Sequence, residues 1–400
     1  MVRRLIWSVI ATGLVGAGGF LAGCAPPGDL IVTKSADTND GVCNADCSLR
    51  EAVHLANTRP GRDTVRLALA SLSLVGDGED ANATGDLDVT GDLVVEADPR
   101  VDEAIIRANR IDRILDVHAG VVELRRLRLE GGVAGDDTGG GIRNRSALTL
   151  VDVVVSGGGA RTGGAIDSNN PAGGTPSLTL LRTTIEFNFV GEEGGGINSR
   201  GTLRIEDSRI TDNVSGGGFG AGVFTAGDAV IRNTVISDND SADCGGGIAS
   251  GGTLEMRGST IEFNHAALGA GIDNFGTLTV VGGKIRSNRA EGSGGGIANM
   301  GPNASALVDG TEIAANIADS DDRVSDDFCL IGAEDGGGLF NQGTFALRNA
   351  TVAFNDDLTG GAPDCAGTYR DRGGNVIGDI TGCTLVPSAE SSRGLDLKLG

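Results

Sequence analysis

A glycine-rich signature that recurs along the chain constrains the fold more than any other feature of the sequence. Each copy has two glycines, or Gly-Ala-Gly, then a large aliphatic residue and, two positions later, a small hydrogen-bonding residue. The eight aliphatic anchors are Ile142, Ile166, Ile197, Val223, Ile248, Ile272, Ile297 and Leu339. They follow one another at intervals of 24, 31, 26, 25, 24, 25 and 42 residues. A period of this kind predicts stacked identical units in place of a single globular core.

The regular copy from Gly269 to Ala290 shows what one unit contains. It holds three short runs of alternating residues, GIDN, TLTV and KIRSN, separated by glycine-containing turns. Such runs, rich in Ile, Val, Leu and Thr, are typical of strands and too short for helices. We therefore predict an all-β chain that forms a right-handed parallel β-helix, with three-strand coils of about 25 residues stacked about 4.8 Å apart. Roughly ten coils between Leu87 and Asn355 would form a rod on the order of 50 Å long.

Two columns of polar residues recur with the same period. The residue two positions after each anchor faces the interior with it, so these residues are expected to bond to one another as a buried ladder. The predicted ladder is Asn144, Ser168, Ser199, Thr225, Ser250, Asn274, Asn299 and Asn341. A second asparagine ends the third run, and we predict a turn role for it because asparagine tolerates the left-handed conformation. These turn asparagines are Asn188, Asn213, Asn239, Asn264, Asn288, Asn316 and Asn355.

The N-terminal segment predicts export. Two arginines open the chain, an apolar stretch follows, and Leu21-Ala22-Gly23-Cys24 resembles a bacterial lipobox. The resemblance implies that residues 1–23 are a lipoprotein signal peptide and that Cys24 carries the lipid, so that the protein is anchored to a membrane through its N-terminal lipid. Ala25 in place of aspartate favours the outer membrane or the cell surface within the cell envelope. Ordinary signal cleavage and an uncleaved anchor are the alternatives.

The other six cysteines suit an oxidising compartment. Cys43 and Cys47 are close enough in sequence to pair, and so are Cys365 and Cys383. Cys244 and Cys329 lie on coils about 14 Å apart, whereas a disulfide needs Cα atoms within about 7 Å. That pair requires the insertion from Ile317 to Asp335 to fold back along the rod, and the sequence leaves the question open.

A short helix is expected to cap the first coil. Ser48 and Glu51 have the spacing of a capping box, and Leu49, Ala52, Val53 and Ala56 fall on one face. An amphipathic helix laid over the open end would cover its apolar stack and its exposed strand edges.

Several motifs identify a family resemblance. Cys47-Ser48-Leu49-Arg50-Glu51-Ala52 is similar to the motif that names the CSLREA-domain proteins, which are exported bacterial proteins with β-helix repeats. Gly163-Gly164-Ala165-Ile166 resembles the GGAI repeat of chlamydial polymorphic outer-membrane proteins. The resemblance covers residues 30–400 and implies a β-helix without a settled enzymatic activity. Related proteins usually continue beyond a segment like that at Gly394–Gly400, so we expect a minimal cap at this end.

These observations divide the chain into five expected parts. After the signal peptide come a tether and leading strand over residues 24–36 and the CSLREA cap over 37–86. The β-helix repeats follow over 87–358, and a disulfide-bearing C-terminal cap or tail occupies 359–400.

Few carboxylates are placed for chemistry. Among the positions just after the anchors, which we expect to face outward, Asp167 and Asp273 lie four coils apart, roughly 19 Å, and cannot act on one bond. Asp212 and Asp238 are expected about one coil apart, with Asp240 nearby. They are turn aspartates, a Ca²⁺ site or, least favoured, catalytic carboxylates.

Composition excludes some functions. The only tryptophan is Trp7 and the only tyrosine is Tyr369, so flat aromatic platforms for sugars are scarce. The three histidines lie far apart in the repeat order, and no Ser-His-Asp set can be assembled. A net charge of −22 without a basic patch argues against nucleic acid.

The sequence therefore favours a non-enzymatic, lipid-anchored envelope protein that uses a β-helix rod for adhesion or extracellular interaction with a protein or glycan. The alternative is a β-helix polysaccharide lyase or glycoside hydrolase. No cofactor is expected, and Ca²⁺ at Asp212, Asp238 and Asp240 is the less favoured alternative.

Overall fold

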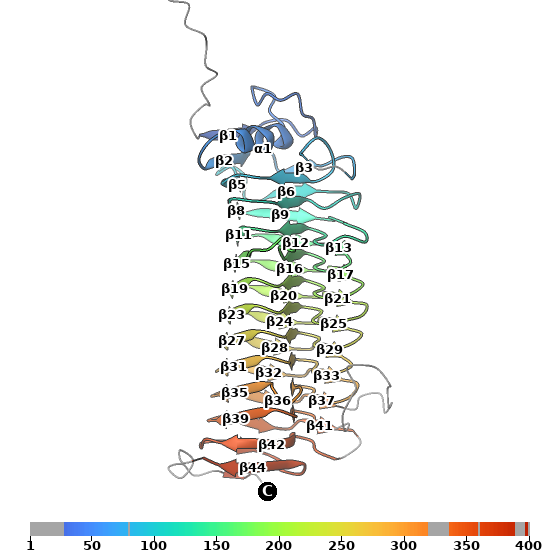
Figure 1. Ribbon diagram of the computed structural model, residues 1–400, viewed down its shortest axis with the longest axis vertical. Helices are drawn as coiled ribbons and strands as arrows, with labels where there is room; N and C mark the ends of the chain where they lie inside the picture. Colours follow the sequence, from blue (N-terminus) through green and yellow to red (C-terminus); the bar gives the residue numbers. More distant parts are fainter. Residues whose placement is uncertain (1–27, 79–80, 319–335, 359–360, 389–396, 399–400) are drawn as a thin grey trace, which may run out of the picture.

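The chain forms one elongated rod (Figure 1). The computed structural model describes residues 28–78, 81–318, 336–358, 361–388 and 397–398. Over these residues the chain is a parallel β-helix of about 11 turns, so the predicted fold is confirmed. The signal peptide and Cys24 lie outside the described residues, and the lipid anchor stays a prediction. No helix of the described part is long and apolar enough to cross a membrane.

Two of the sheets share strand β42 near the C-terminal end. Sheet A consists of β1 (Asp29–Val32), β2 (Asp63–Leu67), β5 (Leu93–Ala97), β8 (Val121–Arg125), β11 (Ala147–Val151), β15 (Ser177–Leu181), β19 (Thr202–Glu206), β23 (Asp228–Arg232), β27 (Thr253–Arg257), β31 (Thr277–Val281), β35 (Ser305–Asp309), β39 (Thr344–Arg348), β42 (Cys365–Asp371) and β44 (Cys383–Pro387). Sheet C consists of β4 (Leu87–Val89), β7 (Leu115–Val117), β10 (Ile142–Asn144), β14 (Ile166–Ser168), β18 (Ile197–Ser199), β22 (Val223–Thr225), β26 (Ile248–Ser250), β30 (Ile272–Asn274), β34 (Ile297–Asn299) and β38 (Leu339–Asn341).

The other two sheets consist of shorter strands. Sheet B consists of β3 (Ser71–Ser73), β6 (Ala104–Arg107), β9 (Leu127–Glu130), β12 (Val154–Ser156), β16 (Thr184–Glu186), β20 (Arg209–Thr211), β24 (Val235–Ser237), β28 (Thr260–Glu262), β32 (Lys284–Arg286), β36 (Glu312–Ala314), β40 (Thr351–Ala353), β43 (Val376–Ile377) and β45 (Leu397–Lys398). Sheet D consists of β13 (Gly159–Ala160), β17 (Phe189–Val190), β21 (Val214–Ser215), β25 (Asp240–Ser241), β29 (His265–Ala266), β33 (Arg289–Ala290), β37 (Ile317–Ala318) and β41 (Asp356–Asp357). The prediction of three strands per coil missed sheet D because its two-residue strands directly follow the turn asparagine and read as part of the third run.

Sheets A, B and C enclose the apolar core. One turn shows the pattern: Ile272 of sheet C, Leu278 and Val280 of sheet A and Ile285 of sheet B are all buried in it. Because each residue type recurs in the next turn, like stacks on like along the rod.

A second buried layer covers the outer face of sheet C. The glycine-rich loops that return from sheet D fold over this face, so loop residues Cys244 and Leu268 pack against Ala298 and Phe340 of the sheet. The approach is close: a Cβ at Gly269, which has φ +58°, would lie 2.7 Å from Cβ of Asp273. The positions after the anchors therefore do not face solvent as predicted, because the loops bury them.

Both polar columns differ from their predicted roles. The turn asparagines form a continuous buried ladder, in which the side-chain amide of Asn213 donates to Oδ1 of Asn239 at 2.9 Å, and that of Asn239 to Asn264 at 2.9 Å. The left-handed conformation belongs to the residue before each asparagine, for example Asp212 and Asp238 with φ of 55° and 58°. The predicted turn role of these asparagines was therefore wrong.

The predicted ladder is interrupted. Asn274 donates to Asn299 at 2.7 Å, and Asn299 donates to Asn341 at 2.8 Å. Asn144 donates to Ser168 at 2.9 Å. Between these segments the hydroxyls of three buried residues have no partner, because a serine or threonine side chain is too short to reach the equivalent side chain in the adjacent turn. They are Ser199, Thr225 and Ser250.

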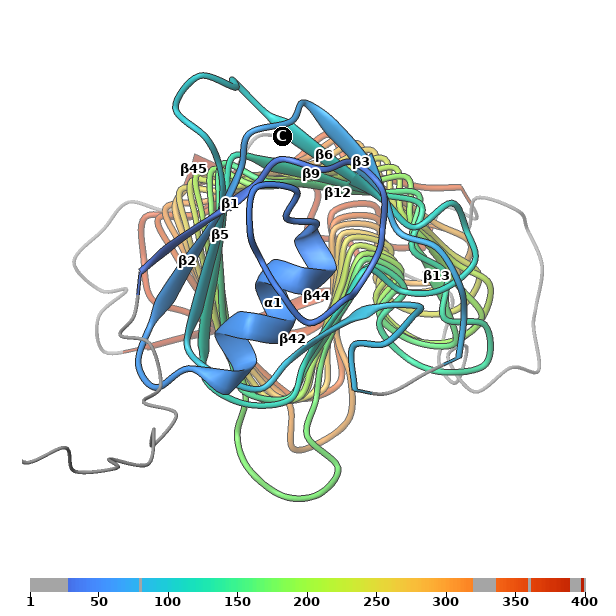
Figure 2. The same cartoon turned by 90° about the horizontal axis from the view of Figure 1, so that it is seen from above.

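The N-terminal end is closed by helix α1 (Leu49–Thr58), which lies across the mouth of the coil in Figure 2. Ser48 and Glu51 form the predicted capping box. Arg50 is buried: it makes a two-pronged ion pair with Asp37 and donates to the carbonyl of Asp86 at 2.8 Å. The CSLREA-like motif therefore ties the helix to the first turn.

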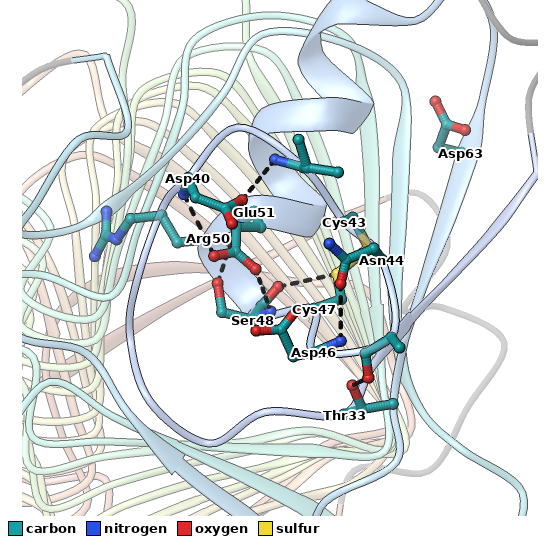
Figure 3. The surroundings of a disulfide bond; sticks show 12 residues. Thr33, Asp40, Cys43, Asn44, Asp46, Cys47, Ser48, Arg50, Glu51 and Asp63 are labelled. Carbon is teal, nitrogen blue, oxygen red and sulfur yellow. Dashed lines mark hydrogen bonds between the residues drawn. A yellow bond between two sulfur atoms is a disulfide. The ribbon is translucent and has the colours of Figure 1, made fainter.

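Two of the predicted disulfides are present. Cys43 and Cys47 pair beside the capping box with a Cα–Cα distance of 4.4 Å (Figure 3). Cys365 and Cys383 pair at 5.4 Å. Cys244 is buried, but Cys329 lies outside the described residues, so their pairing stays a prediction.

Candidate functional site

Charged side chains gather where sheet C begins, next to the cap. Asp88 of β4, Asp116 of β7 and Arg143 of β10 occupy the same position on successive strands and are paired in register. Sheet D has no strand in the first turns that the structure describes, so no glycine-rich loop of the later kind covers these residues. The position that carries Phe224, Ala249, Ala298 and Phe340 farther along the rod is therefore charged in these first turns.

Asp88 is held in place by the cap. Its Oδ2 accepts hydrogen bonds from the backbone amides of Ala81 at 2.8 Å and Asn82 at 2.7 Å. Its Oδ1 lies 2.7 Å from Nε2 of His118. The carboxylate is buried, and these donors compensate for its lost hydration.

Asp116 is fully buried among cations. Its Oδ2 accepts from Nε of Arg143 at 2.8 Å and also from Nη2 of the same residue. Arg145 lies 3.4 Å from this oxygen, and Nε2 of His118 lies 3.3 Å from it. The second oxygen, Oδ1, has no partner.

The contacts of His118 define its proton position. Nη1 of Arg145 lies 3.1 Å from Nδ1, and a guanidinium can only donate, so Nδ1 accepts. The ring proton is then on Nε2, where it points to Asp88. His118 thus connects a carboxylate to a guanidinium.

A second arm of the network links the site to the loop before β10. Arg113 contacts Asp86 at 3.0 Å and Asp137 at 2.5 Å, and Arg143 contacts Asp137 at 2.6 Å. Burial raises the pKa of Asp86 to about 7, opposed by Arg113 and reinforced by Asp88. Asp137 differs from the other acids because its side chain is 51% exposed while it bridges two nearly buried arginines.

A pocket of about 440 Å³ opens over this network. Its charged lining consists of Asp112, Arg113, His118, Asp137, Arg143 and Arg145. Arg145 is the least committed of the arginines, since its Nη2 lies 3.4 Å from Asp116, its Nη1 contacts His118, and its side chain is 28% exposed. Three guanidinium groups therefore line the opening together with two carboxylates, those of Asp112 and Asp137, in a chain whose net charge is −22.

The same residues include a set with metal-ligand chemistry. Among the residues that the structure describes, Asp88, Asp116 and His118 form a group whose ligand atoms lie within 4.8 Å of one another. A metal on Nε2 would shift the ring proton to Nδ1, where it would face the Arg145 guanidinium, a donor facing a donor. The arrangement therefore fits an ion-pair network of aspartates and arginines and does not fit a divalent ion.

The site also lacks the geometry of a glycoside hydrolase. Such enzymes place two carboxyl groups on either side of a bound sugar. Asp88 and Asp116 are both buried, and their oxygens point to amides, His118 and Arg143. No sugar can reach between them without breaking these bonds.

Comparison with known proteins yields no family match. No protein-family model matches the sequence, and no curated protein matches it. Among solved structures, the chain is similar to the crystal structure of pectate lyase Pel9A, with a TM-score of 0.48 and 15% identity over 73% of this chain and 76% of that chain.

The acidic residues Asp212, Asp238 and Asp240, which the sequence offered as a Ca²⁺ site, do not converge on one point. Asp212 accepts a hydrogen bond from the hydroxyl of Thr211 at 2.8 Å, and Asp238 is exposed at the equivalent corner of the next turn. Asp240 pairs with Nδ1 of His265 at 2.8 Å, which lowers the pKa of Asp240. The three aspartates do not form a group of converging ligands among the described residues, and their turn geometry supports the structural interpretation.

The charged pocket was missed in the sequence, although a signal was present. The tripeptide Leu-Asp-Val occurs at Leu87–Val89 and again at Leu115–Val117, directly before His118. It marks the two turns of sheet C that precede the first glycine-rich anchor. The glycine-rich anchors begin at β10, two turns after the first of these tripeptides, and so they do not mark the site.

Proposed function

We propose that this protein is an exported, non-enzymatic β-helix rod, anchored by a lipid on Cys24, that binds an anionic group of an extracellular ligand in the pocket beside its cap. A carboxylate or sulfate of an acidic glycan or protein is the chemistry that an arginine-lined opening favours. The observation that carries the proposal is the pocket of about 440 Å³ lined by Arg113, Arg143 and Arg145. The CSLREA-like and lipobox-like motifs support export and envelope attachment.

Arg145 is the residue that we expect to meet the ligand. Arg113 and Arg143 are each bound to two aspartates at short distances, whereas Arg145 has one aspartate, Asp116, at the longer distance of 3.4 Å and has an exposed part. A ligand anion can therefore approach Arg145 without first breaking a strong ion pair. Because the attraction is electrostatic, binding should weaken as salt concentration rises.

Binding of the purified protein to acidic and neutral polysaccharides by calorimetry tests the proposal. We expect Arg145→Gln to abolish binding of the acidic polymer and Arg182→Gln, which removes an exposed partner of Asp152 elsewhere on the rod, to leave it unchanged. Equal binding by both variants would overturn the assignment of the pocket. Cleavage of any polymer would favour the polysaccharide lyase or glycoside hydrolase alternative.

Lipid attachment needs a separate experiment. Labelled fatty acid should be attached to the unsubstituted protein when cells express it, and it should not be attached to the Cys24→Ala variant. Equal labelling of the two would refute the anchor and leave the pocket assignment standing.

A further inference from the structure

Three exposed phenylalanines occupy a corner of the rod where their presence is costly. The residue between sheets B and D has a left-handed backbone in every turn from β9 to β40. At three of these corners the residue is Phe187, Phe263 or Phe354, with φ of 56°, 57° and 63° and 62%, 55% and 83% of the residue exposed. A left-handed backbone is sterically unfavourable for a non-glycine residue. The equivalent residues of two earlier turns are glycines, Gly131 and Gly157, so the fold does not require a side chain here.

The three rings are evenly spaced along the rod. Parallel register connects β16, β20, β24, β28, β32, β36 and β40 without a gap. Phe187 follows the first of these strands, Phe263 the middle one and Phe354 the last. Neighbouring rings are thus three turns apart, roughly 14 Å. The stripe is symmetric about Phe263.

We propose that this corner binds a second copy of the chain, antiparallel, about a twofold axis that passes beside Phe263. A twofold contact requires a surface that is complementary to itself when its direction is reversed. The aromatic stripe meets this condition: Phe263 faces its own copy, and Phe187 faces Phe354 of the partner subunit.

Two charge pairs and one apolar pair beside the stripe meet the same condition. Counting turns from the axis places Arg209, two turns before β28, opposite Glu312 of the partner subunit, two turns after it. On sheet D, Asp240 comes opposite Arg289 of the partner subunit, and Val214 comes opposite Ile317 of the partner subunit. Opposite charges and apolar pairs therefore meet on both sides of the aromatic stripe.

The acidic residues of the corner select the antiparallel direction. Asp212 and Asp238 lie between Phe187 and Phe263, and the equivalent corners on the other side of Phe263 carry Ser287 and Ala315. A parallel pair would place each aspartate against its own copy, and like charges in contact oppose association. The antiparallel pair places them against serine and alanine. Six turn spacings make this contact roughly 29 Å long.

Cysteine cross-linking tests both the contact and its axis. Phe263→Cys should form an intermolecular disulfide with itself, since only a residue on a twofold axis meets its own copy. Ser287→Cys, one turn away on the same corner, is the matched control and should cross-link at least tenfold more slowly. A mixture of Phe187→Cys and Phe354→Cys chains should yield the mixed dimer in preference to either symmetric one.

Sedimentation equilibrium supplies the second measurement. We expect the unmodified protein to dimerise and Phe263→Asp to lower its association constant at least tenfold while its thermal unfolding is unchanged. A monomeric unmodified protein, or a Phe263→Cys variant that cross-links no faster than the control, would overturn the proposal. A monomer in which Phe263→Asp abolishes binding of a neutral glycan would also overturn it and would assign the stripe to sugar.

Discussion

Asp116 and Asp273 occupy the same position of sheet C in different turns, and both are fully buried, yet their surroundings are opposite. Asp116 lies among Arg143, Arg145 and His118. Asp273 lies between two alanines of the neighbouring strands, and neither of its oxygens has a hydrogen-bond partner. The difference follows from what covers the sheet: charged partners fill the open first turns, whereas the glycine-rich loops close over the later ones.

The largest expected effect on stability comes from removing Asp116, the buried aspartate that has arginine partners. Asp116→Ala removes the buried carboxylate that Arg143 and Arg145 share, so their positive charge loses part of its compensation, which should lower the free energy of unfolding by about 3–5 kcal/mol. Urea denaturation monitored by circular dichroism measures this change. As a control, Asp152→Ala breaks an exposed ion pair with Arg182 and should cost less than about 1 kcal/mol. A loss at Asp116 no larger than at Asp152 would mean that the buried network does not stabilise the cap end.

The two polar columns permit a second contrast in one turn. Asn239→Ala removes an amide that donates to Asn264 and to the carbonyls of Ile210 and Ser237, all buried. Each partner left unpaired costs about 1–3 kcal/mol, so we expect a loss of at least about 2 kcal/mol. Ser250→Ala, in the neighbouring column, removes a hydroxyl with no partner and should be neutral or slightly stabilising. If both substitutions cost the same, the ladder has no special role.

The pocket supplies a smaller stability effect of its own. Burial raises the pKa of Asp137, but the Thr138 amide, Arg113 and Arg143 outweigh it and hold the pKa below its usual range. The ionised carboxylate therefore stabilises the fold above the unfolded-chain pKa of about 4, and that contribution is lost as pH falls. Because the side chain is half exposed, Asp137→Asn should cost only about 1 kcal/mol at neutral pH. Thermal unfolding measured at several pH values tests this. If the stability of Asp137→Asn falls with pH as steeply as that of the natural chain, then other residues cause the loss of stability in acid.

The sequence predicted what depends on one repeat and missed what depends on contacts between turns. The period of the anchors was sufficient for the β-helix, and the spacing of Ser48 and Glu51 was sufficient for the capped helix. The predicted ladder forms in part, at Asn144–Ser168 and at Asn274–Asn299–Asn341. The continuous ladder lies in the other column and was missed, because only the dihedral angles show which residue takes the left-handed conformation. The charge network joins residues about one turn apart, such as Asp88 and His118, and no local pattern records such a pairing.

Asp273→Ala should stabilise the protein, in the opposite direction to Asp116→Ala, and its effect should depend on pH. The substitution matches the alanines at the same position in the two neighbouring turns, Ala249 and Ala298. Burial raises the pKa of Asp273 well above its usual value, so the folded chain holds a proton that the unfolded chain releases. The contribution of that proton to stability is fully present below the unfolded-chain pKa of about 4 and is lost as pH rises.

The unsubstituted protein should therefore lose stability with rising pH at this position, while Asp273→Ala should not. We expect a gain of about 1–2 kcal/mol that is larger near pH 8 than near pH 5, since an unpaired buried polar group costs about 1–3 kcal/mol. Asp273→Asn is the control: it removes the titration but keeps an unpaired polar group, so it should abolish the pH dependence with a smaller gain. A gain that does not change with pH would show that cavity shape, and not the proton, determines stability here. The outer face of sheet C would then be selected for packing alone beneath the loops, and the charged first turns would be the only part of it where electrostatics determines the residue.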